Sequence, residues 1–124
     1  MANKLQKNKS LSFLQAIKSL SRDSLSPIYF IYGEERYLQD ELIQKILELA
    51  VDATTREFNL DIFYANEIDV EKTINISRSY PLIADKRVVV IKDIHFFKAN
   101  AIKQLDNYLA NPSHSTCLIL TYPK

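Results

Sequence analysis

The chain has 124 residues, of which 47% are hydrophobic and 25% are charged, and this composition is typical of one compact globular domain rather than a disordered chain. Its 16 basic and 15 acidic side chains give a net charge of +1, so the chain has no overall positive field that would attract nucleic acid. Any contact with DNA therefore has to be local or indirect. No apolar run approaches the roughly 18 residues that a membrane span requires, and we expect no membrane contact.

A single glycine and a single cysteine limit the sites that the chain can form. The common phosphate-binding loops need more than one glycine, so Gly33 alone excludes them. Cys117 alone excludes an internal disulfide and a multi-cysteine metal site. Because Cys117 lies in an apolar run, we expect a buried, unreactive thiol, which fits a reducing cytosol.

The chain begins with a basic leader, residues 1–9, followed by a predicted helix. We expect Ser10 to be the N-cap of this helix. The residues expected on its inward face are Leu11, Phe13, Leu14, Ile17 and Leu20. We expect residues 21–27 to form a connector. We therefore divide the chain into a leader with one helix, 1–24, and a domain, 25–124.

The domain opens with a strand and a long helix. Ile28–Tyr32 is continuously apolar or aromatic and stops at Gly33, which predicts a buried strand and a turn. A helix follows through about residue 50, with Glu34 and Glu35 suited to its positive end. Its apolar stripe consists of Leu38, Leu42, Ile43, Ile46, Leu47 and Ala50.

A second strand and a short helix come next. The segment 58–64 alternates, and this pattern predicts a half-covered strand near a sheet edge. Its covered face is expected to hold Phe58, Leu60 and Ile62, with Asn59 and Asp61 on the other face. Asp69 is the expected N-cap of a helix from residue 70 to about residue 79, which Pro81 follows.

The strongest strand signal is the run of four β-branched residues at positions 88–91. It predicts a strand over Arg87–Lys92 that is buried on both faces and lies in the middle of a sheet. A helix over about 98–110 and a fourth strand over Ser115–Tyr122 follow. Strands that alternate with helices predict right-handed β-α-β units and a mainly parallel sheet, which is an α/β fold.

The segment Pro81–Ala84, just before that strand, is apolar where polar loop residues would be expected. The proline disfavours a continuing helix. One alternative is that Leu82 and Ile83 fold back onto the core of the domain. The other is that they form an exposed anchor for the pocket of a partner protein, supported by Tyr80, Pro81 and Ala84.

Acidic residues near the strand ends form a second candidate site. Open α/β sheets usually bind ligands at the carboxyl edge. The residues that could meet there and hold Mg²⁺ are Glu34, Glu35, Asp93 and Thr121, with Asp93 as a phosphoacceptor of the kind found in phospho-receiver domains. We favour the alternative, in which the two glutamates serve the helix dipole and Asp93 is a turn residue.

The remaining polar and aromatic candidates have ordinary structural interpretations. We expect His95 and His114 to be solvated loop histidines. Of Phe96 and Phe97, we expect one in the core rather than both in a stacking surface for nucleic acid. A basic group consists of Lys72, Arg78, Lys86 and Arg87. We expect this group to be a solvated face.

The order of these features resembles the N-terminal domain of the delta subunit of the bacterial DNA polymerase III clamp loader. Four stretches carry the resemblance, which covers about residues 25–124: Pro27–Leu38, Arg78–Lys92, Leu105–Pro112 and Thr116–Leu120. It implies a three-layer α/β/α, RecA-like domain of the AAA+ type with strand order 1-4-3-2. The fifth strand of the full RecA-like order is missing from the sequence.

The resemblance also implies a lost nucleotide site. Gly33–Leu38 stands where relatives that bind ATP carry the phosphate loop, and no Gly-Lys-Thr is present. Asp93 falls near the acidic position that holds Mg²⁺ in those relatives. We therefore expect no cofactor and no ATP hydrolysis, and a non-catalytic subunit of the DNA polymerase III holoenzyme.

The partner that the resemblance implies is the sliding clamp, the beta subunit. Leu82 and Ile83 occupy the positions of a hydrophobic pair that inserts into the clamp and favours its opening for loading onto primed DNA. Ile83 is aliphatic where relatives often have an aromatic residue. Relatives also have a middle domain and a C-terminal collar domain, which bind the other loader subunits. Because the chain stops just after a buried-looking strand, we expect a fragment of a longer three-domain cytoplasmic protein, with an apolar sheet edge exposed.

Overall fold

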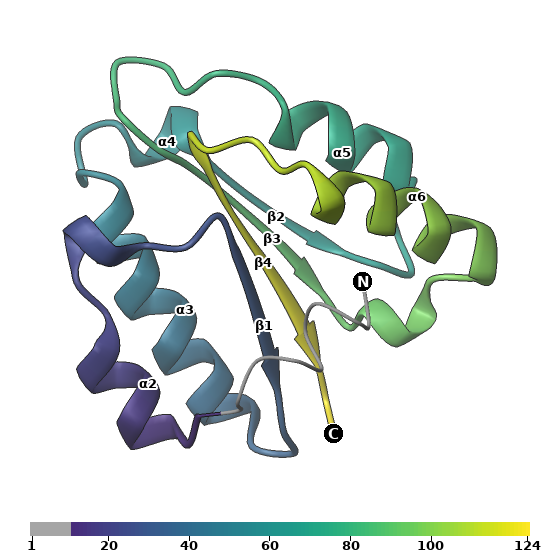
Figure 1. Ribbon diagram of the computed structural model, residues 1–124, viewed down its shortest axis with the longest axis horizontal. Coiled ribbons are helices and arrows are strands. Elements are labelled where there is room, and N and C mark those ends of the chain that lie inside the picture. Colours follow the sequence, from purple (N-terminus) through teal and green to yellow (C-terminus); the bar gives the residue numbers. More distant parts are fainter. Residues whose placement is uncertain (1–10) are drawn as a thin grey trace.

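The computed structural model describes residues 11–124 as a sheet of four parallel strands between two layers of helices (Figure 1). The strand order is β1-β4-β3-β2. The α/β class that the sequence pattern predicted is confirmed, and so are the three layers and the order 1-4-3-2 that the resemblance implied. The expected leader, residues 1–9, and the expected N-cap Ser10 lie outside the described residues.

The two central strands, β3 (Arg87–Lys92) and β4 (Thr116–Tyr122), are buried along nearly their whole length. Successive residues face opposite sides of the sheet, so each strand contributes to two cores. One core contains Val89, Ile91, Leu118 and Leu120, and the other contains Val88, Val90, Cys117 and Ile119. This arrangement explains why the sequence of both strands is continuously apolar rather than alternating.

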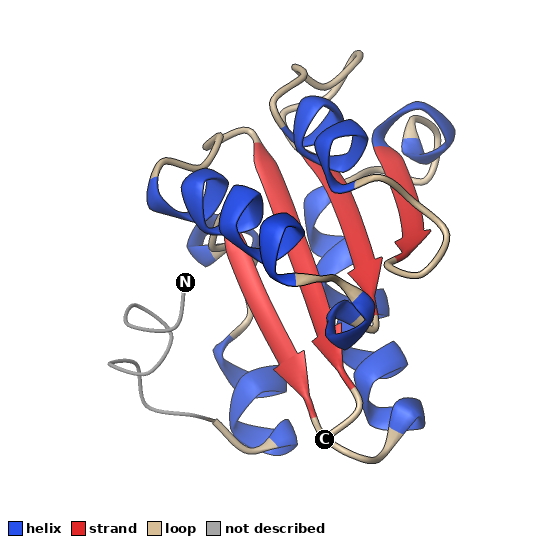
Figure 2. Cartoon of the chain, turned by 90° about the vertical axis from the view of Figure 1, so that its right-hand side faces the viewer, coloured by secondary structure: helices blue, strands red, loops and turns tan. Residues whose placement is uncertain are grey.

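Each core is closed by its own pair of helices. Helices α5 (Val70–Ser77) and α6 (Ala99–Ala110) cover the first core, and α3 (Arg36–Ala50) with α2 (Phe13–Ser19) lies on the opposite face. Figure 2 shows helices in front of and behind the strands. Asp69 caps α5, as predicted, by accepting a hydrogen bond of 3.1 Å from the Glu71 N–H.

Helix α2 differs from the prediction in its cap and its face. Ser12 is the N-cap, and it forms a capping box with Gln15 in which each side chain accepts from the backbone N–H of the other residue. The helix therefore begins at Phe13, so Leu11 lies before it, and both Leu11 and Leu14 are exposed. Phe13, Ile17 and Leu20 are partly buried, as expected.

The edge strands are less covered than the sequence indicated. Strand β1 spans Ile28–Tyr32, as predicted, but within it Ile31 alone is fully buried. The second strand, β2, is Leu60–Tyr64, and the residues before it form a short helix, α4 (Arg56–Asn59). The expected covered face is wrong at two positions: Phe58 belongs to α4 rather than to β2, and Ile62 is exposed on this edge strand, whereas α3 packs mainly against the central strands β3 and β4.

Two 3-10 helices, Arg22–Ser24 in the connector and Ile94–Phe96 after β3, complete the described elements. Within residues 11–124, no helix combines the length and apolar character needed to cross a membrane. In the sheet, the two central strands are buried, the two edge strands are half-covered, and loops lie at both ends.

Cys117 provides a direct test of the burial of β4. Its side chain is completely buried, and this burial raises the pKa of the thiol, since the thiolate is the form that loses solvation. The thiolate is also the nucleophile in disulfide exchange. At pH 8 we expect Ellman's reagent to label the folded chain at least about 1000-fold more slowly than the chain unfolded in guanidinium, because labelling has to wait for unfolding. Fast stoichiometric labelling of the folded chain would contradict the described position of β4.

Candidate functional site

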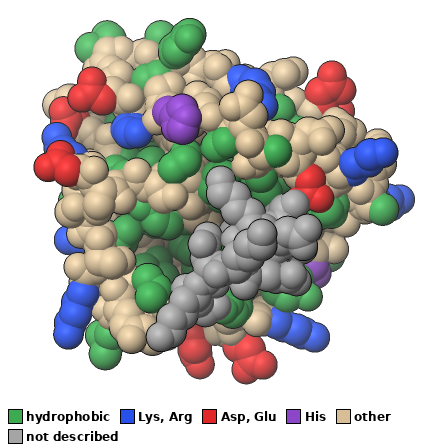
Figure 3. All heavy atoms as spheres, viewed as in Figure 1, with side chains coloured by type: hydrophobic (Ala, Val, Ile, Leu, Met, Phe, Trp, Pro, Cys, Tyr) green, Lys and Arg blue, Asp and Glu red, His purple; other side chains and the backbone are tan. Residues whose placement is uncertain are grey.

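The loop between α5 and β3 carries the candidate residues, and we call Tyr80–Ala84 the apolar tip. The side chains of Tyr80, Leu82 and Ile83 have exposed fractions of 82%, 54% and 87%, whereas Pro81 and Ala84 are partly buried. In Figure 3, hydrophobic side chains stand out at the top of the molecule, where Figure 1 shows the α5–β3 loop. Of the two arrangements left open by the sequence, the structure has the exposed one.

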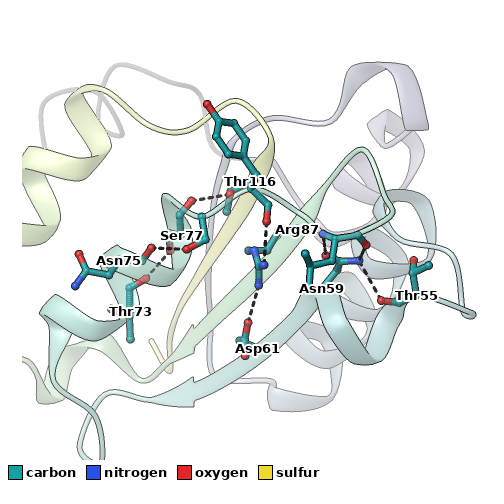
Figure 4. Close-up of polar contacts among 11 residues, drawn as sticks. Thr55, Asn59, Asp61, Thr73, Asn75, Ser77, Arg87 and Thr116 are labelled. Atoms are coloured by element: carbon teal, nitrogen blue, oxygen red, sulfur yellow. Dashed lines mark hydrogen bonds and ion pairs between the residues drawn. The ribbon is translucent and has the colours of Figure 1, made fainter.

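The loop leaves α5 at a point that is fixed to the sheet. The Thr116 hydroxyl donates a 2.6 Å hydrogen bond to the Ser77 carbonyl, and the Ser77 hydroxyl donates to the Thr73 carbonyl at 2.8 Å (Figure 4). All three side chains are buried. The end of α5 is thus attached to the first residue of β4 by contacts that exclude water.

The loop enters β3 at a second fixed point. The Arg87 N–H donates to the Ser115 carbonyl at 2.8 Å, which continues the hydrogen bonding between the two central strands. One residue earlier, the Lys86 ammonium donates to the His114 carbonyl at 2.7 Å. The apolar tip is therefore a short segment between two anchored ends.

Asn59 holds the middle of the tip through the backbone of Leu82. The Leu82 N–H donates to Asn59 Oδ1 and Asn59 Nδ2 donates to the Leu82 carbonyl, both at 2.7 Å. Asn59 Nδ2 also donates to the Thr55 carbonyl at 3.1 Å (Figure 4). The sequence pattern placed Asn59 on an open strand face, and this was wrong: its side chain is fully buried at the end of α4.

Arg87 holds the tip at Tyr80. Its guanidinium donates to the Tyr80 carbonyl at 3.1 Å and to the Asp61 carboxylate at 3.2 Å (Figure 4). Arg87 was expected in a solvated basic face, but it is 8% exposed because it begins the central strand β3 underneath the loop. The nearby carboxylate of Asp61 offsets the cost of burying the positive charge.

The backbone of Ile83 is strained. Its φ is +53°, in the left-handed region, which is uncommon for any residue with a side chain and a marked outlier for a β-branched one. Such a conformation costs about 1–3 kcal/mol, and a residue keeps it only where contacts with the surrounding structure enforce it. Here the strain falls on the most exposed apolar side chain of the tip.

The acidic residues at the opposite, carboxyl edge of the sheet do not assemble as a metal site. Asp93 and Thr121 do meet, since the Asp93 N–H donates to the Thr121 hydroxyl at 3.0 Å. The Asp93 carboxylate pairs with Arg36 at 3.3 Å, while Glu34 and Glu35 are exposed. Across residues 11–124, no three His, Cys, Asp or Glu side chains are grouped in a way that could hold a metal ion. The phosphoacceptor hypothesis for Asp93 gains no support.

The turn after β1 is closed by a residue that the sequence reading missed. The buried Gln39 amide donates to the Gly33 carbonyl at 2.8 Å and to the Tyr122 carbonyl at 2.9 Å. This side chain ties the turn to the end of β4. The exposed carboxylates of Glu34 and Glu35 add negative charge beside the turn, which disfavours a phosphate group there.

The remaining candidates mostly take the expected positions. His95 and His114 are exposed. Phe96 is exposed while Phe97 packs against the core, so one of the pair is in the core as predicted. The apolar tip is consequently the candidate site that the structure leaves accessible and holds in place.

Comparison with known proteins identifies the family. Residues 29–124 match the family model described as the delta subunit of DNA polymerase III. The DNA polymerase III subunit delta of Bacillus subtilis (strain 168) is 29% identical in an alignment 114 residues long, which covers 86% of this chain and 33% of that protein.

Solved structures agree with the sequence comparison. The Bacillus subtilis DNA clamp loader delta protein superposes with a TM-score of 0.83 and 28% identity, covering 90% of this chain and 35% of its own. A DNA polymerase III gamma subunit-related protein from Thermotoga maritima superposes with a TM-score of 0.58 over 86% of this chain and 36% of its own, and at 14% identity it shares the fold alone.

The chain spans about a third of the length of the Bacillus subtilis relatives, 33% and 35% in the two comparisons. The match to the family model covers most of the chain, including β1 from its second residue on, the apolar tip and the central strands. The chain belongs to the DNA polymerase III delta subunit family.

Proposed function

We propose that residues 25–124 form the domain of a clamp-loader delta subunit that binds the sliding clamp, the beta subunit of DNA polymerase III, and helps to open it for loading onto primed DNA during replication. Leu82 and Ile83 are the anchors, and Tyr80, Pro81 and Ala84 support them. The observation that carries the proposal is the exposure of these two aliphatic side chains on a loop fixed at both ends, in a chain of this family.

The free energy gained by burying Leu82 and Ile83 indicates how large the contact with the clamp has to be. Burying Leu82 and Ile83 in a pocket contributes about 3 to 6 kcal/mol, which is less than the roughly 8 kcal/mol of micromolar affinity. The exposed ring of Tyr80 offers further apolar area on the same loop. We therefore expect a contact that includes all of the tip, with the two aliphatic residues at its centre.

Clamp opening requires that the tip bind one clamp conformation better than another. A ligand shifts an equilibrium between two states by the difference of its affinities for them. A flexible tip adapts to both states, whereas a rigidly held tip discriminates between them. The anchoring of the loop by Ser77, Asn59 and Arg87 supports a role in opening as well as in binding.

The rest of the proposal concerns chemistry and assembly. We propose a non-catalytic role without ATP or another cofactor, supported by the negative charge and the Gln39 contacts at the turn where a phosphate loop would stand. The net charge of +1 supports an indirect relation to DNA. We assign the contacts with the other loader subunits to parts of the delta subunit outside this chain. We propose that the protein acts in the cytoplasm.

The double substitution Leu82→Ala/Ile83→Ala tests the anchors. Loss of at least 3 kcal/mol of burial is expected to weaken binding of the chain to the sliding clamp by about 100-fold or more, measured by isothermal titration calorimetry. The matched control is Leu11→Ala/Leu14→Ala, which removes two exposed leucines from the region of α2. Clamp affinity within twofold of the unmodified chain, in a double variant with unchanged circular dichroism, would remove the tip from the interface.

The substitution Ile83→Asn separates strain from binding. Asparagine tolerates the left-handed conformation better than isoleucine, so the free energy of unfolding is expected to rise by about 1 kcal/mol and the melting temperature by roughly 4 °C. Clamp affinity is expected to fall by at least about 10-fold because an apolar anchor is lost. Leu82→Asn is the control, since Leu82 has no positive φ and should lose affinity without gaining stability. If Ile83→Asn lowers the melting temperature and Leu82→Asn does not, backbone strain at Ile83 is contradicted.

A further inference from the structure

We propose that Asn59 is a positioning residue for clamp binding: it holds the apolar tip in its binding conformation before the clamp arrives, without forming part of the contact surface. This inference rests on the proposed function. Its basis is the paired hydrogen bonds between the Asn59 amide and the backbone of Leu82, both 2.7 Å long.

The geometry of Asn59 suits this role. A primary amide has one acceptor oxygen and one donor nitrogen, and here each is used on the backbone of one residue in the way that a neighbouring strand would use its own peptide groups. The same nitrogen also donates to the Thr55 carbonyl within α4. The side chain is fully buried, so its rotamer is fixed by its surroundings.

The position of Asn59 in the chain makes it a rigid support. It is the last residue of α4, and the next residue, Leu60, begins β2 and pairs with Val88 of β3. Asn59 is thus attached to the sheet directly. Leu82 lies in the loop before Arg87, the first residue of β3, and among the described residues its backbone hydrogen bonds are both with the Asn59 side chain.

Satisfying the backbone of Leu82 does not by itself require Asn59. The tip is exposed, so water could take the place of both hydrogen bonds if the loop moved. What the amide provides is one loop conformation in place of several. The left-handed φ of Ile83, the next residue, supports this reading, since a strained residue stays in place where its neighbours leave it no alternative.

Preorganisation has a kinetic signature that differs from the loss of a contact. When a fraction of the molecules has the binding-competent conformation, the apparent dissociation constant rises by the inverse of that fraction. If the binding-competent fraction falls to about one in ten without Asn59, affinity falls about 10-fold. The association rate constant carries this change, while the dissociation rate constant of the assembled complex stays nearly the same. Removing an anchor does the reverse, because contact losses act mainly on dissociation.

The test compares Asn59→Ala, the control Asn107→Ala and the double variant Leu82→Ala/Ile83→Ala on immobilised sliding clamp by surface plasmon resonance. Asn107 is an exposed asparagine on α6. For Asn59→Ala we expect an association rate constant about 10-fold lower and a dissociation rate constant within about twofold of the unmodified chain. The control should match the unmodified chain, and the double variant should lose binding.

A second measurement examines the free protein without the clamp. Hydrogen exchange followed by NMR should show the Leu82 amide protected in the unmodified chain and at least about 10-fold less protected in Asn59→Ala, with the core amides of β3 unchanged. If Asn59→Ala does not fold, Asn59→Asp takes its place, since it retains the acceptor for the Leu82 N–H and loses the donor to the Leu82 carbonyl. We expect its association rate constant to fall as well.

The outcomes separate the inference from the function on which it rests. Unchanged association for Asn59→Ala or Asn59→Asp, with binding lost in the double variant, overturns the positioning role and leaves the tip as the anchor. A faster dissociation with unchanged association also overturns it, because Asn59 would then act in the bound complex. Normal binding by the double variant removes the proposed function itself.

Discussion

The burial of β3 and β4 along nearly their whole length is the constraint on which the rest of the structure depends. An exposed loop keeps one conformation when the segments that flank it cannot move, and the four β-branched residues at positions 88–91 have almost no exposed surface. Each of them packs against helices on one side or the other, so a shift of the strand would disturb both cores at once. The exposed tip can therefore be held rigidly because the strand behind it has no freedom.

Burial of the strand alone does not fix the conformation of the loop backbone, and two polar side chains do so. Arg87 and Asn59 come from under the loop, and they bind the carbonyl of Tyr80 and both backbone groups of Leu82. Both are themselves shielded from water, which strengthens these hydrogen bonds relative to exposed ones. The apolar side chains are in this way directed outward, while the peptide groups of the same residues are directed inward.

The sequence predicted those features that depend on local pattern and missed those that depend on distant partners. Runs of β-branched and aromatic residues determined the bounds of β1 and β3, and the Asp69 cap was visible from its position alone. The tip was recognisable because apolar residues after a proline contradict the usual composition of a loop. The burial of Asn59 and Arg87 was not recognisable, since their partners Leu82 and Asp61 lie 23 and 26 residues away. Alternation in segment 58–64 also misled, because the coverage of an edge strand depends on where the neighbouring helix happens to end.

The two ends of the sheet are held by separate sets of contacts. At the carboxyl edge, where parallel sheets usually bind ligands, polar groups are engaged with one another: Gln39 with the ends of β1 and β4, and Arg36 with Asp93. The tip lies at the amino end of β3, and its supports come from α4, β2 and the start of β4. None of the described contacts that position the tip passes through the carboxyl edge. A fold of this type can therefore hold an exposed apolar loop at one edge of the sheet by contacts that are independent of those at the other edge.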